Sequence, residues 1–180
     1  MSINLIMGCM FSGKTSKLIN VAKNCKLIGK KVLLINFSGD TRYSSSNFIT
    51  THNGISIECK TCNTNIIDVE NFMDYQTAEV ICINEGQFFT NLVNFCKRAC
   101  NLGKEVHVCG LDSDYRMEPF GDIIKLIPCC DNVEKMKAIC MGCTNGTLAS
   151  FTKRIGNSQN LVEIGSTEMY LPVCRTCYNN

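Results

Sequence analysis

The sequence predicts an α/β fold, in which helices cover a parallel sheet and a small metal-held domain follows. Three observations support this prediction. Two apolar runs flank an amphipathic stretch between Ile3 and Phe37. Two more apolar runs of strand length come later in the chain. After Pro128 the character of the sequence changes, and cysteines cluster there.

The amino-terminal stretch predicts one strand–helix–strand unit. Residues 3–7 form a short apolar run typical of a buried strand. Over 14–28, apolar side chains recur at helical spacing with polar ones on the opposite face, and Gly29 ends the pattern. Residues 31–37 form a second buried strand. Strands joined in this way through a helix run parallel, so the unit indicates a parallel sheet.

The rest of the chain extends this α/β pattern and then leaves it. In order, we predict a loop over 38–53, an edge strand over 54–59, a buried strand over 80–83, a helix over 89–101 and a buried strand over 106–109. Short antiparallel strands are predicted over 135–140 and 147–152. We therefore divide the chain into an ATP-binding α/β domain, 1–130, and a metal-held domain, 131–180.

Composition excludes several classes of protein. Of the 180 residues, 45% are hydrophobic and 19% charged, which suits a folded domain rather than a disordered chain. The net charge is +2 and no basic run exceeds a pair, which argues against a dedicated nucleic-acid binder. No apolar run approaches the roughly 20 residues of a membrane span.

The amino terminus and the cysteine content together predict a cytoplasmic protein. The first residues lack the basic start and longer apolar stretch of a signal peptide. Without such a signal, we interpret the 14 cysteines as reduced thiols, some of them buried and some of them metal ligands.

A phosphate-binding loop follows the first predicted strand. Residues 8–15, Gly-Cys-Met-Phe-Ser-Gly-Lys-Thr, fit the pattern G-x-x-x-x-G-K-[ST]. The glycines let backbone N–H groups converge on phosphate oxygens, and the amino terminus of the next helix favours negative charge. Lys14 is expected to reach the β- and γ-phosphates, and the Thr15 hydroxyl can bind Mg²⁺. The predicted phosphate contacts from this loop are Gly8, Met10, Phe11, Ser12, Gly13, Lys14 and Thr15.

The loop sits in the strand–loop–helix context of a P-loop NTPase-type sheet. It therefore predicts nucleotide binding, but it does not choose among kinase, GTPase and helicase. That choice depends on residues elsewhere in the chain.

An acidic segment follows the strand predicted over 80–83. In P-loop proteins a carboxylate at such a strand end faces the metal and the phosphates. Here the first position is Asn84, which is neutral, and Glu85 is the only carboxylate. Glu85 is placed where a general base for a hydroxyl acceptor is useful. The alternative is that Glu85 is a solvated side chain at a strand end.

Two C-x-x-C pairs predict a metal site. Cys140 with Cys143 and Cys174 with Cys177 supply four thiolates on two tight turns, which suits structural Zn²⁺. A closed Cys₄ site has no open coordination position, so we interpret it as structural. The long segment between the pairs becomes a loop tied at its base. A third pair, Cys59 and Cys62, cannot complete a tetrahedron alone, and we interpret it as ordinary thiols.

The order of longer strings in the chain resembles one enzyme family. The strings are Met-Phe-Ser-Gly-Lys at 10–14, Asp-Thr-Arg-Tyr at 40–43, Glu-Gly-Gln-Phe-Phe at 85–89, Gly-Leu-Asp at 110–112 with Pro-Phe-Gly at 119–121, Ala-Ser-Phe-Thr-Lys-Arg at 149–154 and Val-Cys-Arg-Thr-Cys-Tyr at 173–178. Together they resemble the type II thymidine kinases essentially from end to end, and the compact chain is similar to the short viral members.

The resemblance implies roles for individual residues. Glu85 would take the proton from the thymidine 5′-hydroxyl, and Arg42, Asn84 and Gln87 would join the phosphate loop in serving ATP and Mg²⁺. The segment between the cysteine pairs would form a lasso over the base, with backbone groups near Leu161, Glu163 and Gly165 bonding thymine. The nucleoside pocket would be lined by Met10, Phe88, Leu111, Tyr115, Phe120, Thr152 and Tyr170.

The resemblance also implies partners. The substrates would be ATP and thymidine, with deoxyuridine as a further acceptor, and dTMP would be the product. The triphosphate end product dTTP would inhibit by feedback, and the protein would be a homotetramer with structural Zn²⁺. Neither nucleic acid nor a membrane is expected as a partner.

Four positions depart from the family pattern: Cys9 replaces the usual Pro, Asn84 the usual Asp, Tyr115 a usual Phe and Ser166 a usual Gly. Only Asn84 bears on the chemistry, because it removes a carboxylate near Mg²⁺. Two other functions therefore stay open. One is a nucleotide-binding protein with reduced or no kinase activity because of Asn84. The other is a zinc-ribbon ATPase that acts on nucleic acid, which the charge pattern supports little.

Overall fold

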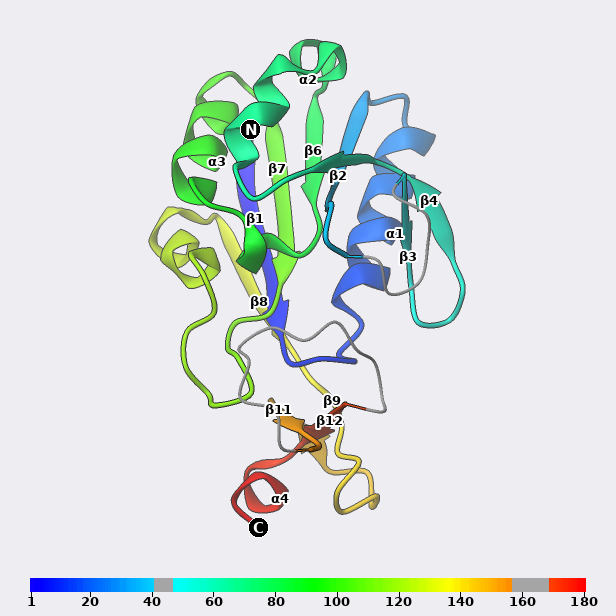
Figure 1. Ribbon diagram of the computed structural model, residues 1–180. Helices are drawn as coiled ribbons and strands as arrows, with labels where there is room; N and C mark the ends of the chain where they lie inside the picture. The colour runs from blue at the N-terminus through cyan, green and yellow to red at the C-terminus, as the bar shows by residue number, and fades with distance from the viewer. Residues whose placement is uncertain (41–46, 157–168) are drawn as a thin grey trace.

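The computed structural model describes residues 1–40, 47–156 and 169–180. At its centre is a six-stranded sheet in the order β5-β2-β6-β7-β1-β8, and every neighbouring pair runs parallel (Figure 1). The strands are β1 (Ser2–Gly8), β2 (Val32–Phe37), β5 (Lys60–Cys62), β6 (Val80–Ile83), β7 (Glu105–Gly110) and β8 (Asn132–Met136). The predicted α/β fold with a parallel sheet is confirmed.

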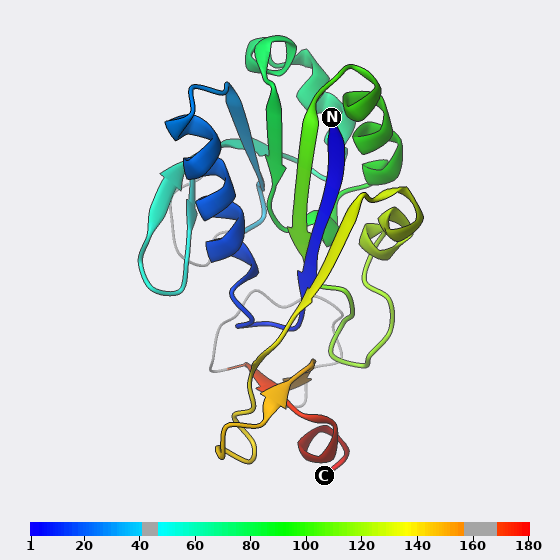
Figure 2. The same ribbon diagram turned by 180° about the vertical axis from the view of Figure 1, so that it is seen from behind.

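Helices cover both faces of this sheet (Figures 1 and 2). α1 (Lys14–Leu27) packs on one face, and α3 (Leu92–Asn101) packs on the other together with the 3₁₀ helix η3 (Ile123–Cys129). Successive side chains of a strand point to opposite faces. In β6, Ile81 and Ile83 accordingly join the cluster around α3, whereas Val80 and Cys82 join the cluster around α1. Burial on both faces explains why these strands are continuous apolar runs.

The remaining elements are short. On the side of α3, the 3₁₀ helix η1 (Ile66–Asn71) leads into α2 (Met73–Thr77), and η2 (Gly86–Phe88) follows β6. β3 (Phe48–Thr50) and β4 (Ser56–Glu58) form an antiparallel hairpin. No helix within the described residues is long and apolar enough to cross a membrane.

The carboxyl-terminal part is built from small antiparallel pairs beyond the carboxyl ends of the sheet strands (Figure 2). β9 (Ala138–Ile139) pairs with β10 (Leu148–Ala149), β11 (Phe151–Arg154) pairs with β12 (Tyr170–Val173), and α4 (Arg175–Asn179) follows. Cys9 belongs to the same buried cluster as Ala138, Ala149 and Val173, and Phe11 packs against it. The phosphate loop and the carboxyl-terminal part therefore share a core.

Three predictions of local structure need correction. The loop expected over 38–53 contains β3, and the strand expected over 54–59 is β4, which pairs with β3 rather than with the edge of the main sheet. Residues 135 and 136 are not in an antiparallel strand, because they belong to β8, which lies parallel to β1. β8 is largely exposed, so backbone pairing rather than an apolar pattern places it. β8 lies after residue 130 and still belongs to the main sheet. The division of the chain into two domains at residue 130 stays a prediction.

Candidate active site

The phosphate loop lies between the carboxyl end of β1 and the amino terminus of α1, as its sequence context predicts. Gly8 touches β8 closely: a Cβ atom there would lie 2.3 Å from the Met136 carbonyl oxygen. Gly13 precedes α1 with φ of 85°, in the left-handed region that favours glycine. Both motif glycines are therefore required by the backbone, and the loop presents the N–H groups at the start of α1.

Lys14 lies across this loop. Its Nζ atom donates a hydrogen bond to the Cys9 carbonyl oxygen at 2.6 Å. Burial lowers the pKa of Lys14, and the nearby Glu85 carboxylate partly offsets this by favouring the charged form. A half-buried ammonium group gains from a phosphate partner, because opposite charges interact more strongly where the dielectric is lower than in water.

Asn84 is the centre of a buried hydrogen-bond network at the end of β6. Its side-chain oxygen accepts from the Thr15 hydroxyl at 3.3 Å and from the Cys109 thiol at 3.1 Å. Its amide nitrogen donates to the Asn36 side-chain oxygen at 2.9 Å. Burial, followed by the Glu85 charge, raises the pKa of Cys109 to about 12, so the thiol stays protonated and can donate. The neutral amide thus satisfies partners from α1, β2 and β7.

Glu85 follows with a backbone in the left-handed region, at φ 55° and ψ 43°. Its carboxylate accepts from the Gln87 side-chain amide at 2.5 Å. Gln87 in turn accepts from the Leu111 backbone N–H at 3.0 Å. Gly110 permits this approach, since a Cβ atom there would lie 2.2 Å from the Gln87 oxygen. Through these hydrogen bonds Gln87 holds the Glu85 carboxylate against the end of β7. Its expected service to ATP or the metal stays a prediction.

One cavity joins these groups. Its lining includes Lys14, Thr15, Asn84 and Glu85, so oxygen ligands of the kind Mg²⁺ prefers stand beside the phosphate loop. The remaining lining residues are Met10, Phe11, Gly13, Ser16, Asp40, Thr50, Thr51, His52, Asn53 and Leu111. Residues 50–53 belong to the β3–β4 hairpin and were not predicted here, because nothing in their polar sequence marks a fold back onto the phosphate loop.

The predicted nucleoside-pocket residues come together in small groups. The Thr152 hydroxyl accepts from the Met10 backbone N–H at 3.0 Å, which joins β11 to the phosphate loop. The Phe88 and Phe120 rings meet edge to face with centroids 5.4 Å apart. Phe37, which we did not predict, stacks on Phe88 at 4.7 Å.

Arg154 joins two further members of this set, and sequence reasoning did not select it. Its guanidinium lies 3.9 Å from the Tyr115 ring centroid and 5.1 Å from that of Tyr170, a cation–π arrangement. It also donates to the Tyr170 hydroxyl at 2.5 Å. The available signal was its spacing: Thr152 and Arg154 are two residues apart on β11 and share one face of the strand.

Four predicted residues, Arg42, Leu161, Glu163 and Gly165, lie outside the described residues, as does the departure at Ser166. The predicted lasso over the base therefore stays a prediction, as does the phosphate contact of Arg42.

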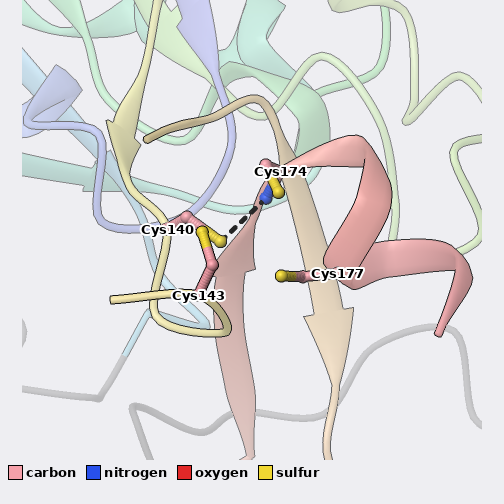
Figure 3. A group of neighbouring side chains, drawn as sticks. All are labelled: Cys140, Cys143, Cys174 and Cys177. Atoms are coloured by element: carbon pink, nitrogen blue, oxygen red, sulfur yellow. Dashed lines mark hydrogen bonds between the residues drawn. The ribbon is translucent and has the colours of Figure 1, made fainter. Parts of the chain in front are cut away.

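The four predicted metal ligands converge (Figure 3). The Sγ atoms of Cys140, Cys143, Cys174 and Cys177 all lie within 4.8 Å of one another, and within the described chain they are the one group of three or more His, Cys, Asp or Glu that could hold a metal. The Cys174 backbone N–H donates to the Cys140 sulfur at 3.1 Å, drawn as the dashed line in Figure 3. Gly142 is needed in the first turn, because a Cβ there would lie 2.7 Å from the Cys177 Cβ.

The thiols of this cluster differ in pKa. Burial alone would raise the pKa of Cys140, but hydrogen bonds from Cys143, the Cys174 backbone and the Gly142 backbone outweigh it, and the pKa falls to about 6. Hydrogen bonding with Cys174, followed by burial, raises the pKa of Cys177 to about 12. Four sulfur ligands in a closed arrangement fit a structural Zn²⁺.

The pair Cys59 and Cys62 differs from this cluster. Cys59 packs in the core on the side of α1, and Cys62 packs in the core on the side of α3. Burial raises the pKa of each to about 11. Thiols that stay protonated suit the interpretation of these two residues as ordinary buried side chains.

Comparison with known proteins gives a consistent result. The family model described as thymidine kinase matches residues 1–178. The chain is 41% identical over 176 residues to a thymidine kinase of Myxoma virus (strain Uriarra), covering 98% of this chain and 95% of the relative. It is 40% identical over 177 residues to that of Vaccinia virus (strain Ankara), covering 98% and 96%. It is 39% identical over 181 residues to thymidine kinase 1 of Dictyostelium discoideum, covering 99% of this chain and 78% of the relative.

Proposed function

The chain belongs to the thymidine kinase family, and we propose how its residues carry out transfer of the ATP γ-phosphate to the 5′-hydroxyl of thymidine. The observation that carries the proposal is the shared cavity: Lys14 and Thr15 of the phosphate loop and the Glu85 carboxylate line the same space. Phosphoryl transfer needs little covalent chemistry from the protein, so placing these groups around one reacting oxygen is most of the task.

Glu85 acts as the general base in this proposal. The residue is only 8% exposed, and the Gln87 amide fixes one carboxylate oxygen. A positioned carboxylate can accept the proton of the 5′-hydroxyl as that oxygen attacks the γ-phosphorus. Gln87 is a positioning residue, because it acts on Glu85 rather than on the substrate.

The phosphate loop holds the donor. Backbone N–H groups at the start of α1 and the Lys14 ammonium bind the β- and γ-phosphates and stabilise the charge that develops there. Thr15 and Asn84 supply the oxygens that would hold Mg²⁺, which neutralises phosphate charge when bound. Gly8, Met10, Phe11, Ser12 and Gly13 shape the loop, and Arg42 is proposed as a further phosphate contact.

The acceptor side is proposed to be the aromatic wall. Phe88, Phe120, Tyr115 and Tyr170 offer apolar faces for a pyrimidine base. Met10, Leu111 and Thr152 are proposed to complete the lining of this pocket. The backbone near Leu161, Glu163 and Gly165 is proposed to bond thymine. Closing a loop over the base excludes water, which would otherwise accept the phosphate.

The finer biology is proposed on family grounds. We propose salvage synthesis of dTMP in the cytoplasm, where reduced thiols can keep the zinc site, with deoxyuridine as a second acceptor. Feedback inhibition by dTTP and a homotetramer belong to the same proposal. Gel filtration with light scattering measures the assembly, and rates measured with added dTTP test the inhibition.

The decisive experiment offers ATP and Mg²⁺ with each of the four natural deoxynucleosides, and with deoxyuridine, and detects the monophosphates. Conversion of thymidine, and of no natural deoxynucleoside besides it, is expected. Glu85→Gln keeps the shape of the side chain but loses the base, so kcat should fall by about 10²–10⁴-fold. A variant rate within about threefold of wild type would remove Glu85 from the role of base.

A second candidate function is a nucleotide-binding protein with reduced or no kinase activity. The buried neutral amide of Asn84 favours it, because this amide puts no charge beside Mg²⁺. ATP binding without conversion of any nucleoside would support this candidate. ATP hydrolysis stimulated by DNA would instead support the zinc-ribbon ATPase.

A further inference from the structure

The carboxyl-terminal helix reaches the proposed nucleoside pocket through one hydrogen bond. The Tyr178 hydroxyl donates to the backbone carbonyl oxygen of Tyr115 at 2.7 Å, across 63 positions of sequence. Tyr178 immediately follows Cys177 in α4, and Tyr115 lies in the segment 111–120 between β7 and η3. This bond therefore connects the four-cysteine cluster to the segment that carries Tyr115 and Phe120.

The segment 111–120 is ordered internally as a turn. The Asp114 carboxylate accepts from the backbone N–H groups of Arg116 and Glu118 at 2.8 and 3.0 Å, and the Asp114 N–H donates to the Glu118 carbonyl at 2.9 Å. These bonds fix the shape of the turn. The ends of the segment are held by Leu111 against Gln87, by Phe120 against Phe88 and by Asp112 in an ion pair with Lys135 of β8. Its middle is placed relative to β11 and β12 by contacts made across to the carboxyl-terminal part.

Tyr115 makes these contacts. Its carbonyl oxygen is held by Tyr178, and its ring is covered by the Arg154 guanidinium from β11. Arg116 donates to its hydroxyl at 2.9 Å, but this contact lies within the same segment and anchors nothing outside it.

The position of Tyr178 follows from the cysteine cluster. Its backbone N–H donates to the Cys174 carbonyl at 2.9 Å, and its ring packs against Phe151 with centroids 5.8 Å apart. The Lys153 ammonium donates to the Cys177 carbonyl at 3.0 Å, which ties the same turn to β11. α4 is a single short helix that could not hold its shape alone. The turn that includes Cys174 and Cys177, together with its contacts to Phe151 and Lys153, therefore determines where the Tyr178 hydroxyl lies.

We propose that Tyr178 is a positioning residue for the nucleoside: it holds the Tyr115 wall of the pocket in register with the four-cysteine cluster. The inference rests on the proposed function in one respect, that Tyr115 lines the nucleoside pocket. The cluster then does more than stabilise the carboxyl-terminal fold. Through the hydrogen bond from Tyr178 it also sets the position of Tyr115 at the acceptor site. The phosphate loop meets α4 through the apolar core that includes Cys9, rather than through the Tyr178 hydroxyl.

Tyr178→Phe tests this directly, because it removes one hydroxyl and keeps the ring that packs on Phe151. Losing a hydrogen bond of this kind costs roughly 0.5–1.5 kcal/mol, so the KM for thymidine should rise about 2- to 10-fold. The KM for ATP and the zinc content per chain should match wild type. Amide hydrogen exchange in the zinc-loaded full-length protein should accelerate over 111–120 and stay unchanged in β6 and β7.

Tyr75→Phe is the matched control. Tyr75 is buried where Tyr178 is half-buried, its hydroxyl has no hydrogen-bond partner among the described residues, and it lies in α2, away from the phosphate loop. This variant should leave the KM for thymidine and the exchange of 111–120 as in wild type.

Three results would overturn the proposal. One is unchanged exchange over 111–120 in Tyr178→Phe. Another is loss of zinc from the variant, which would place the hydroxyl in metal retention instead. The third is faster exchange without any change in the KM for thymidine, which would remove Tyr115 from the pocket. The exchange experiment needs no substrate, so a failure of the proposed kinase activity would show separately, as an inactive wild type.

Discussion

The phosphate half and the nucleoside half of the candidate site are built in different ways. The phosphate loop is one continuous stretch between β1 and α1, and its geometry follows from two glycines and the start of a helix. The proposed nucleoside wall is assembled from η2, the segment 111–120, β11 and β12, which meet only in the folded chain. Damage to the carboxyl-terminal part should therefore affect the first half less than the second, although Cys9 and Phe11 share a core with that part.

The largest effect is expected from Lys14→Met. The substitution keeps the apolar stem of the side chain but removes the charge that faces the phosphates, so kcat should fall about 10²–10³-fold. Thymidine affinity and zinc content should stay as in wild type, since the nucleoside half contains no part of Lys14. Steady-state kinetics and calorimetric titration with thymidine measure the two halves separately.

Lys17→Met is the matched control for this variant. It removes the same charge from the same helix, but Lys17 pairs with Glu134 at a largely exposed site. Exposed ion pairs contribute little, so kcat should be unchanged. Loss of thymidine binding in Lys14→Met would mean that the two halves are not independent.

Metal removal is expected to have the next largest effect, and it acts on the other half. The binding energy of a structural zinc is folding energy for the segments it ties, so a chelator should loosen β12, α4 and the Tyr115 wall. The dissociation constant for thymidine should rise by at least about tenfold, the scale of one or two lost hydrogen bonds. The dissociation constant for ATP should change less. The phosphate loop joins β1, which is a strand of the main sheet, to α1, which packs on that sheet.

The control for metal removal is reconstitution with Zn²⁺, which should restore thymidine binding. Equal losses of thymidine and ATP affinity would contradict the independence of the halves. The core that Cys9 and Phe11 share with the carboxyl-terminal part would then carry the damage to the phosphate loop.

The smallest effect is expected from Asn84→Asp, which changes charge within the phosphate half alone. A carboxylate there can still accept from Thr15 and Cys109, but it cannot donate to Asn36, so the Asn36 amide must turn to donate instead. A charged ligand near Mg²⁺ gains about 1 kcal/mol, near the low end of the range for charged hydrogen bonds, so the Mg²⁺ concentration for half-maximal rate should fall about fivefold. Rates measured across a Mg²⁺ series test this.

Asn20→Asp is the control, because Asn20 is exposed on α1 and gives the same change in net charge. It should leave the Mg²⁺ dependence as in wild type. If Asn84→Asp behaved in the same way as Asn20→Asp, the neutral residue at the end of β6 would have no bearing on metal use.

Sequence patterns were sufficient to predict those sites whose residues lie close together in the chain. Lys14 and Thr15 lie where their motif predicts, because a strand, a glycine loop and a helix amino terminus are consecutive in the chain. The four cysteines were found because each pair is a tight turn with its own spacing. The strand at 80–83 was found because burial on both faces leaves an apolar run.

Other features escaped because no local pattern encodes them. β8 is an exposed edge strand held by backbone bonds to β1, so its side chains show no periodicity that marks it. In the sequence, Arg154 is one of two adjacent basic residues and resembles an ordinary surface cation. Only the fold brings its guanidinium against the Tyr115 and Tyr170 rings. The Gln87 amide bonds to Glu85 and Leu111 only because η2 packs against the end of β7.

By itself, the sequence determined the parallel α/β fold, the phosphate loop, the acidic residue after the third buried strand and the four-cysteine metal site. Each of these depends on residues close together in the chain, where geometry follows from spacing. Only the tertiary structure decided that Asn84 links three elements, that Arg154 joins two aromatic rings and that Tyr178 reaches Tyr115. Those contacts span up to 69 positions of sequence, and they exist because packing of the sheet and the carboxyl-terminal part brings distant segments together.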